Sequence, residues 1–233
     1  MKVRIKFRKY GVMKFIGHLD IMRYFQKVMR RADIPIAFTG GYSPHMIMSF
    51  AQPLGVGVTS DGEYFDIEIT EPISSAKAVE QMNKVNVEGI EVVSFVQIPD
   101  DKKCSGMTIV AAADYEVSFL EDTFDSVYWK NKINEFMAQP EIRIMKKTKR
   151  SEQEVDIKPM IHKMEMNGNT VYMFLATGSE QNLKPDLVMQ ALFAFVNVEK
   201  EHKLHFKRLD VFAKHPEKKG EFIALDALGT EIL

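Results

Sequence analysis

Residues 2–32 read KVRIKFRKYGVMKFIGHLDIMRYFQKVMRRA, and the spacing of apolar residues changes once along this stretch. In residues 2–9, apolar and basic side chains alternate, and this period of two predicts a half-buried β-strand. In residues 18–32, apolar residues recur every three or four positions, which predicts an amphipathic helix with a basic outer side. Pro35 ends that helix. The chain therefore opens with a strand followed by a helix.

The rest of the first hundred residues predicts further strands and a second helix. Two short apolar runs, 34–38 and 46–51, flank a glycine-rich loop, and residues 64–69 alternate again, so we expect further strands there. Ser74 and Ser75 cap a helix that runs to about residue 85, and the β-rich run 90–98 follows it. The resulting order of β, α, β, β, α, β is that of the ferredoxin-like split βαβ unit.

The second half of the sequence predicts the same order again. A strand at 114–120 precedes a helix from Asp122 or Thr123 to about Ala138, and Asn167-Gly168 marks a hairpin turn. Pro185 opens another helix, and a last strand follows. We therefore expect an α+β fold of two tandem ferredoxin-like domains with antiparallel sheets. The expected boundaries are residues 1–98, a linker over 99–113, and residues 114–233.

Composition excludes several classes of function. The chain has 233 residues, a net charge of −1 and one cysteine, Cys104. A single cysteine forms no internal disulfide, binds no iron–sulfur cluster and makes no CxxC zinc site. Two histidines, His18 and His45, and scattered acidic residues also fall short of a metal signature, so we expect neither a metal nor a cofactor. The N-terminus lacks the apolar core of a signal peptide, and no apolar run approaches the ~20 residues of a membrane helix. The sequence therefore predicts a cytoplasmic protein without a membrane partner.

Charge is unevenly distributed along the chain. Residues 1–50 carry ten Lys or Arg and two acidic residues, a net charge of +8, while the remainder carries −9. Such asymmetry predicts a surface that faces a polyanion. The alternative is that the basic strand pairs inside the fold with Asp66 and Glu68 of a neighbouring strand. The helix has only Asp20 and Asp33 nearby, so its own charge remains positive in either case.

The basic helix and the glycine-rich loop after it form the candidate site for RNA or another anion. Basic helix faces and glycine amides contact phosphates, although such groups also serve as solvated surface and as turns. The candidate residues are His18, Arg23, Lys27, Arg30, Arg31, Gly40, Gly41, Tyr42, Ser43 and His45. A second basic group, at the tip of a predicted hairpin, consists of Lys146, Lys147, Lys149 and Arg150.

His18 and His45 are the candidates for catalysis. Metal-independent RNA cleavage needs one group that takes the 2′-hydroxyl proton and another that protonates the leaving oxygen. The alternative, which we favour, is that His18 caps the helix and His45 orders the loop. The sequence holds no nucleophile elbow, Walker loop or HExxH motif, so no complete catalytic set accompanies the histidines.

Several segments resemble one family. These are GHLDIMR (17–23), GGYSPHMIMSFAQPLGVGV (40–58), GEYFDIEI (62–69), EVDIKPMI (154–161) and NLKPDLVMQAL (182–192). They are similar to the uncharacterised radical SAM-linked proteins, which stand beside, or are fused to the C-terminus of, a radical SAM protein. The resemblance implies a non-catalytic accessory of such an enzyme, with RNA or a ribonucleoprotein as a further partner. The alternatives are a metal-independent endoribonuclease of the tandem ferredoxin-like type and a protein–protein adaptor without RNA affinity.

Overall fold

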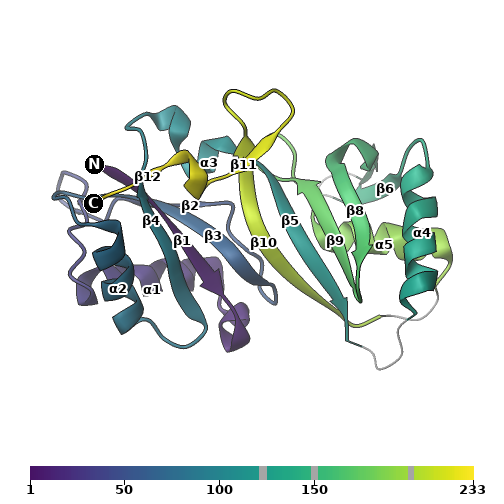
Figure 1. Ribbon diagram of the computed structural model, residues 1–233, viewed down its shortest axis with the longest axis horizontal. Coiled ribbons are helices and arrows are strands. Elements are labelled where there is room, and N and C mark those ends of the chain that lie inside the picture. Colours follow the sequence, from purple (N-terminus) through teal and green to yellow (C-terminus); the bar gives the residue numbers. More distant parts are fainter. Residues whose placement is uncertain (121–124, 148–151, 199–201) are drawn as a thin grey trace.

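The computed structural model describes residues 1–120, 125–147, 152–198 and 202–233, which form a mixed α+β fold (Figure 1). The first half contains β1 (Lys2–Lys9), the 3-10 helix η1 (Gly11–Phe15), α1 (His18–Arg31), β2 (Met48–Ala51), β3 (Thr59–Glu68), α2 (Ser75–Val85) and β4 (Ile90–Gln97). The connection to the second half contains η2 (Lys102–Cys104) and α3 (Gly106–Ile109).

The second half contains the remaining helices and strands. They are β5 (Val110–Phe119), α4 (Ser126–Ala138), β6 (Arg143–Lys147), β7 (Glu152–Asp156), η3 (Lys158–Met160), β8 (Ile161–Asn167), β9 (Thr170–Ala176), α5 (Pro185–Val196), β10 (Leu204–Lys214), β11 (Phe222–Ala224), η4 (Asp226–Leu228) and β12 (Thr230–Glu231). The β6–β7 hairpin forms a separate two-stranded sheet.

Ten strands form one large, mostly antiparallel sheet in the order β12-β4-β1-β3-β10-β5-β9-β8, with β2 beside β3 and β11 beside β10. The two halves meet where β10 pairs in parallel with the start of β3, Lys207 opposite Thr59 and Arg208 opposite Ser60. We call this junction the seam. The last residues of the chain return to the first half, because β12 pairs with the outer edge of β4. The halves therefore share one continuous sheet (Figure 1).

Each half has its own apolar core. The apolar side of β1, made of Val3, Ile5 and Phe7, is at most 1% exposed and packs with α1 and α2. In the second half, β5, β8 and β9 pack against α4 and α5, with Trp129 and Leu192 buried between them. The period-two spacing of apolar residues in the strands and their helical spacing in the helices predicted these faces. The side of an element that is buried is the side that carries its apolar residues.

Several boundaries differ from the sequence prediction. β3 begins at Thr59, ahead of its alternating part, because its polar first residues pair with β10. Residues 34–38 form only isolated bridges, at Ile36 and Phe38. The second-half strand begins at Val110, inside the expected linker. The helix α4 begins at Ser126, capped by Asp125, while the expected caps Asp122 and Thr123 lie outside the described residues.

Candidate functional site

The basic side chains of β1 are largely paired inside the protein. The Arg4 guanidinium is fully buried and donates to both carboxylate oxygens of Asp66, at 2.8 and 3.0 Å. These residues face each other in the β1–β3 register, which confirms the expected pairing of the two strands. At the exposed end of the strand, Arg8 pairs with Glu91 of β4 at 3.1 Å. The basic strand therefore offers little free charge to a ligand.

Lys6 has partners that the sequence did not indicate. Its ammonium lies 2.6 Å from an Asp210 oxygen and 3.7 Å from an Asp226 oxygen. The Tyr64 hydroxyl donates to the same two carboxylates, at 2.6 and 3.0 Å. Burial, followed by these two negative charges, raises the pKa of Tyr64 far above its ordinary value, so this phenol stays protonated. These four side chains join β1 and β3 to β10 and η4 across the seam. Lys6 and Asp210 are 204 positions apart in the sequence, so no local sequence pattern predicts their contact.

A second buried pair lies at the seam. The Arg208 guanidinium is 2% exposed and contacts the Glu63 carboxylate at 2.5 Å. It also donates to the Gln52 carbonyl at 2.9 Å. Each charge is buried and has a partner from the other half, so this pair fixes how the halves meet.

The open face of the second-half strands carries little unpaired positive charge. Asp114 and Asp210 face each other across β5 and β10, and Glu116 faces Lys207 two pairs further along. The ammonium of Lys207 pairs with Asp61 at 2.5 Å. A face with this balance repels phosphates, so it is a poor surface for a nucleic acid.

The helix α1 presents its basic residues to solvent. Its buried side consists of Ile21, Phe25, Val28 and Met29. Its other side carries Arg23, Lys27, Arg30 and Arg31, all of them exposed. Arg23 pairs with Asp20 at 3.2 Å, an exposed ion pair of modest strength. We call these four basic residues the α1 basic face.

The glycine-rich loop between Thr39 and Met46 is exposed and internally ordered. Gly41 has a φ of +98°, which only glycine adopts readily. The His45 amide donates to the Thr39 hydroxyl at 3.1 Å, and the Thr39 amide donates to the His45 carbonyl at 2.9 Å. Tyr42 is fully exposed at the tip, with Gly40 and Ser43 beside it. His45 therefore orders the loop, as expected.

His18 has a different environment and does not meet His45. Gly17 occupies the N-cap without a side-chain cap, so the expectation that His18 caps the helix is wrong. The His18 ring instead packs edge-on against Phe50, with centroids 5.2 Å apart. Phe50 lies on β2, five residues beyond His45 in the chain. The two histidines contact different partners and do not form an acid–base pair in this structure.

The second basic group is described only in part. Lys146 and Lys147 belong to β6, and Lys149 and Arg150 lie outside the described residues. Among the described residues, no three His, Cys, Asp or Glu side chains are arranged to hold a metal ion. Within the same part of the chain, none of the helices has the length and apolar character needed to cross a membrane.

These features define a mixed α+β protein in which α1 presents four exposed basic residues, while Arg4, Lys6 and Arg8 of β1 pair with carboxylates. Residues 2–185 match the family described as an uncharacterized protein conserved in bacteria (DUF2344). The match covers most of the chain, so the protein belongs to this family. A comparison with curated proteins finds no match.

Proposed function

We propose that this protein is a non-catalytic accessory protein that binds RNA, or a ribonucleoprotein, and works with a radical SAM enzyme. The observation that carries the RNA part is the contrast between the two basic elements of the first half. The strand charges Arg4 and Lys6 are consumed by carboxylates, whereas Lys27, Arg30 and Arg31 point to solvent along one helix. Exposed cations on one face neutralise phosphates and release counterions.

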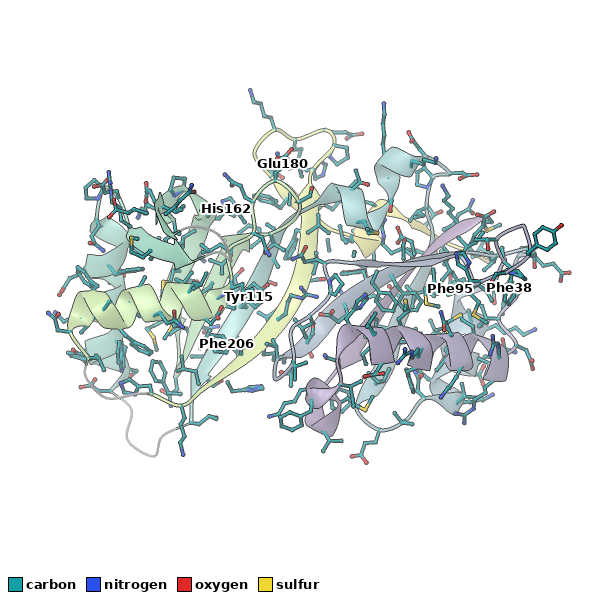
Figure 2. The ribbon with its side chains drawn as sticks, turned by 180° about the vertical axis from the view of Figure 1, so that it is seen from behind. Phe38, Phe95, Tyr115, His162, Glu180 and Phe206 are labelled. Carbon is teal, nitrogen blue, oxygen red and sulfur yellow. The ribbon has the colours of Figure 1, made fainter. Side chains whose placement is uncertain are left out.

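The glycine-rich loop supports the same proposal. It lies beyond the C-terminal end of α1, next to Phe38 (Figure 2). The exposed Tyr42 ring offers a surface on which an unpaired base can stack. Phosphate contacts along α1 and stacking at the loop together suit a single-stranded segment.

The strand order of the large sheet also supports this proposal. The first half has the order β4-β1-β3-β2 and the second half has the order β10-β5-β9-β8. When the separate β6–β7 hairpin is left out, the two orders are the same. The first strand of each half, β1 or β5, lies between the last strand (β4 or β10) and the third strand (β3 or β9). We infer that each half is a ferredoxin-like unit, and units of this kind serve in several RNA-binding proteins.

Exposed apolar residues at the start of α1 support a protein partner. Val12 and Phe15 of η1 are 74% and 62% exposed, and Leu19 of α1 is 60% exposed. The loop that carries the 62% exposed Val56 bonds to η1, because the Gly57 amide donates to the Lys14 carbonyl. Large exposed apolar side chains on adjoining segments are typical of contact surfaces. The identity of the partner as a radical SAM enzyme rests on the sequence resemblance alone.

The experiment is a binding titration with bulk tRNA and with oligouridylate at several salt concentrations. A triple variant, Lys27→Gln/Arg30→Gln/Arg31→Gln, is compared with the wild type. We expect the log–log dependence of affinity on salt to become shallower by roughly two units or more, because each lost phosphate contact removes ~0.7–0.9.

The matched control removes the same charge elsewhere. Lys77, Lys130 and Lys219 are exposed on α2, α4 and the β10–β11 turn, and their triple replacement by Gln should leave the salt dependence nearly unchanged. Equal losses in both triple variants would show nonspecific charge attraction and contradict the proposal.

Cleavage of the RNA in EDTA that disappears in His18→Ala would instead favour the ribonuclease. A stable protein complex with no RNA affinity at any salt would favour the adaptor.

A further inference from the structure

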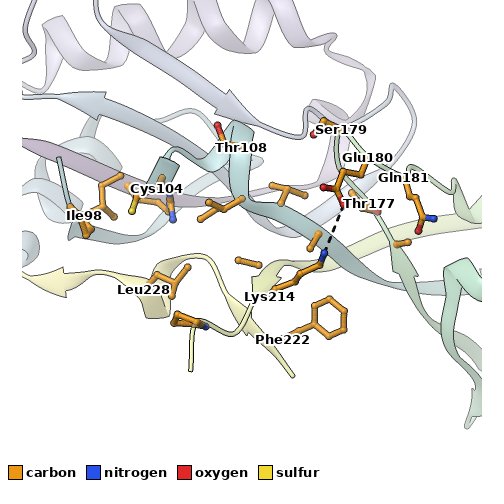
Figure 3. Close-up of a pocket in the computed structure, with 18 of the residues that line it drawn as sticks. Ile98, Cys104, Thr108, Thr177, Ser179, Glu180, Gln181, Lys214, Phe222 and Leu228 are labelled. Atoms are coloured by element: carbon orange, nitrogen blue, oxygen red, sulfur yellow. Dashed lines mark hydrogen bonds and ion pairs between the residues drawn. The ribbon is translucent and has the colours of Figure 1, made fainter. Parts of the chain in front are cut away.

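A cavity of about 660 Å³ lies between the connection, the ends of β9 and β10, and β11, away from the α1 basic face. Figure 3 shows its wall built from segments far apart in the chain: Cys104 and Thr108 of the connection, Thr177 after β9, and Phe222 on β11. Its size falls within the ~300–1,000 Å³ of small-molecule sites. Most of the exposed lining is apolar, as in such sites.

One polar group in this wall lacks a partner. Thr177 is 2% exposed, and its amide donates to the Ala111 carbonyl at 3.0 Å. Its hydroxyl oxygen, however, is covered by protein atoms and has no hydrogen-bond partner among the described residues. Burying a hydroxyl without a partner costs free energy, so a ligand gains a hydrogen bond if this side chain turns its hydroxyl toward the cavity.

The rest of the lining favours an aromatic molecule without net charge. The His162 ring lies against Phe222 and Phe174, with centroids 5.0 and 5.3 Å apart, and its desolvation lowers the pKa of this imidazole. The charged groups of the wall are already paired. Arg4 is neutralised by Asp66, and Lys214 lies 3.8 Å from Glu180 at the exposed rim.

We propose that this cavity binds an uncharged heteroaromatic molecule of nucleoside size, with its ring against the His162–Phe222 wall and a polar ring atom hydrogen-bonded to the Thr177 hydroxyl. An aliphatic ligand would leave the hydroxyl unpaired, and an ionised one would enter without a free counter-charge. The proposal does not depend on RNA binding by α1.

The single cysteine gives a direct assay for occupancy. Cys104 lines the cavity and is the chain's only thiol, so iodoacetamide followed by intact mass reports on this site alone. Adenosine, guanosine, cytidine and uridine are tested one at a time, with ribose as a control that lacks the base. We expect at least one ribonucleoside to slow the alkylation of Cys104 and to give a saturating calorimetric titration, and we expect ribose to do neither.

The Thr177→Val variant separates recognition from structure. Val has nearly the same shape and removes an unpaired hydroxyl, so the variant should unfold at the same or a higher temperature than the wild type. Its affinity for the ribonucleoside should fall roughly tenfold, the effect of one lost hydrogen bond. The proposal is overturned if no ribonucleoside binds, if ribose protects Cys104 equally, or if Thr177→Val binds as tightly as the wild type. Lower thermal stability of the variant would also contradict it, because the hydroxyl would then have a structural role.

Discussion

Replacing Asp114 by Asn should stabilise the protein at neutral pH. Asp114 is 8% exposed on β5, and its carboxylate accepts from the Asp210 amide at 2.7 Å and from the Tyr172 hydroxyl at 3.3 Å. The pKa of Asp114 is raised from 3.8 to about 6, mainly by burial and further by the negative charge of Asp210. An Asn side chain keeps an oxygen for the Asp210 amide and removes the charge.

The sign of the effect follows from linkage. Below about pH 4 the carboxyl is protonated in both the folded and the unfolded chain, so it carries no penalty. Between about pH 4 and pH 6 the unfolded chain loses the proton first, and the free energy of unfolding falls as pH rises. Above about pH 6 the ionised Asp114 lowers the free energy of unfolding by the full amount, on the order of 3 kcal/mol for a pKa shift of about two units. The variant should regain on the order of 1–3 kcal/mol at pH 8 and nothing near pH 4.

Urea unfolding followed by far-UV circular dichroism, repeated across this pH range, measures the difference directly. Glu71→Gln, at an exposed loop position, controls for the loss of one negative charge and should change the stability by less than about 0.5 kcal/mol. A variant that is less stable than the wild type at pH 8, or equally offset at every pH, would refute the reasoning.

Three further substitutions test the seam and the turn beside the cavity. Arg208→Met should destabilise the protein by about 3–5 kcal/mol, because it leaves the Glu63 carboxylate buried without a partner, and adding Glu63→Leu should restore most of the loss in urea unfolding. Tyr64→Phe should cost about 1–3 kcal/mol in the same assay, since two carboxylates lose the hydroxyl that donates to them. Gly178→Ala should lower the melting temperature by calorimetry, at a cost of about 1–3 kcal/mol, because Gly178 has a φ of +138° and a Cβ would collide with the Val110 carbonyl oxygen.

The sequence predicted those features of the fold that depend on local spacing. The alternation in β1 and the apolar stripe of α1 each follow from the burial of one side of one element. The Ser74 cap of α2 and the Asn167-Gly168 turn follow from local backbone hydrogen bonding and conformation. The Arg4–Asp66 pair could be expected as well, because adjacent strands place opposite charges face to face.

The seam could not be predicted in the same way. Its polar contacts join Lys6 to Asp210 and Glu63 to Arg208, and the β3 residues that meet β10 are polar and do not alternate. Only the three-dimensional approach of the halves gives these residues partners. The cavity lined by Thr177 has the same origin, since no sequence motif distinguishes Thr177 from an ordinary strand-end threonine.

The most direct measurement of the central claim is ultraviolet cross-linking of bound tRNA to the protein, with the cross-linked peptides identified by mass spectrometry. We expect cross-links in residues 18–45, above all at the exposed Tyr42, and their loss in the Lys27/Arg30/Arg31 triple variant. Cross-links confined to the open strands β5, β8 and β9, or unchanged in the triple variant, would contradict binding through the α1 basic face.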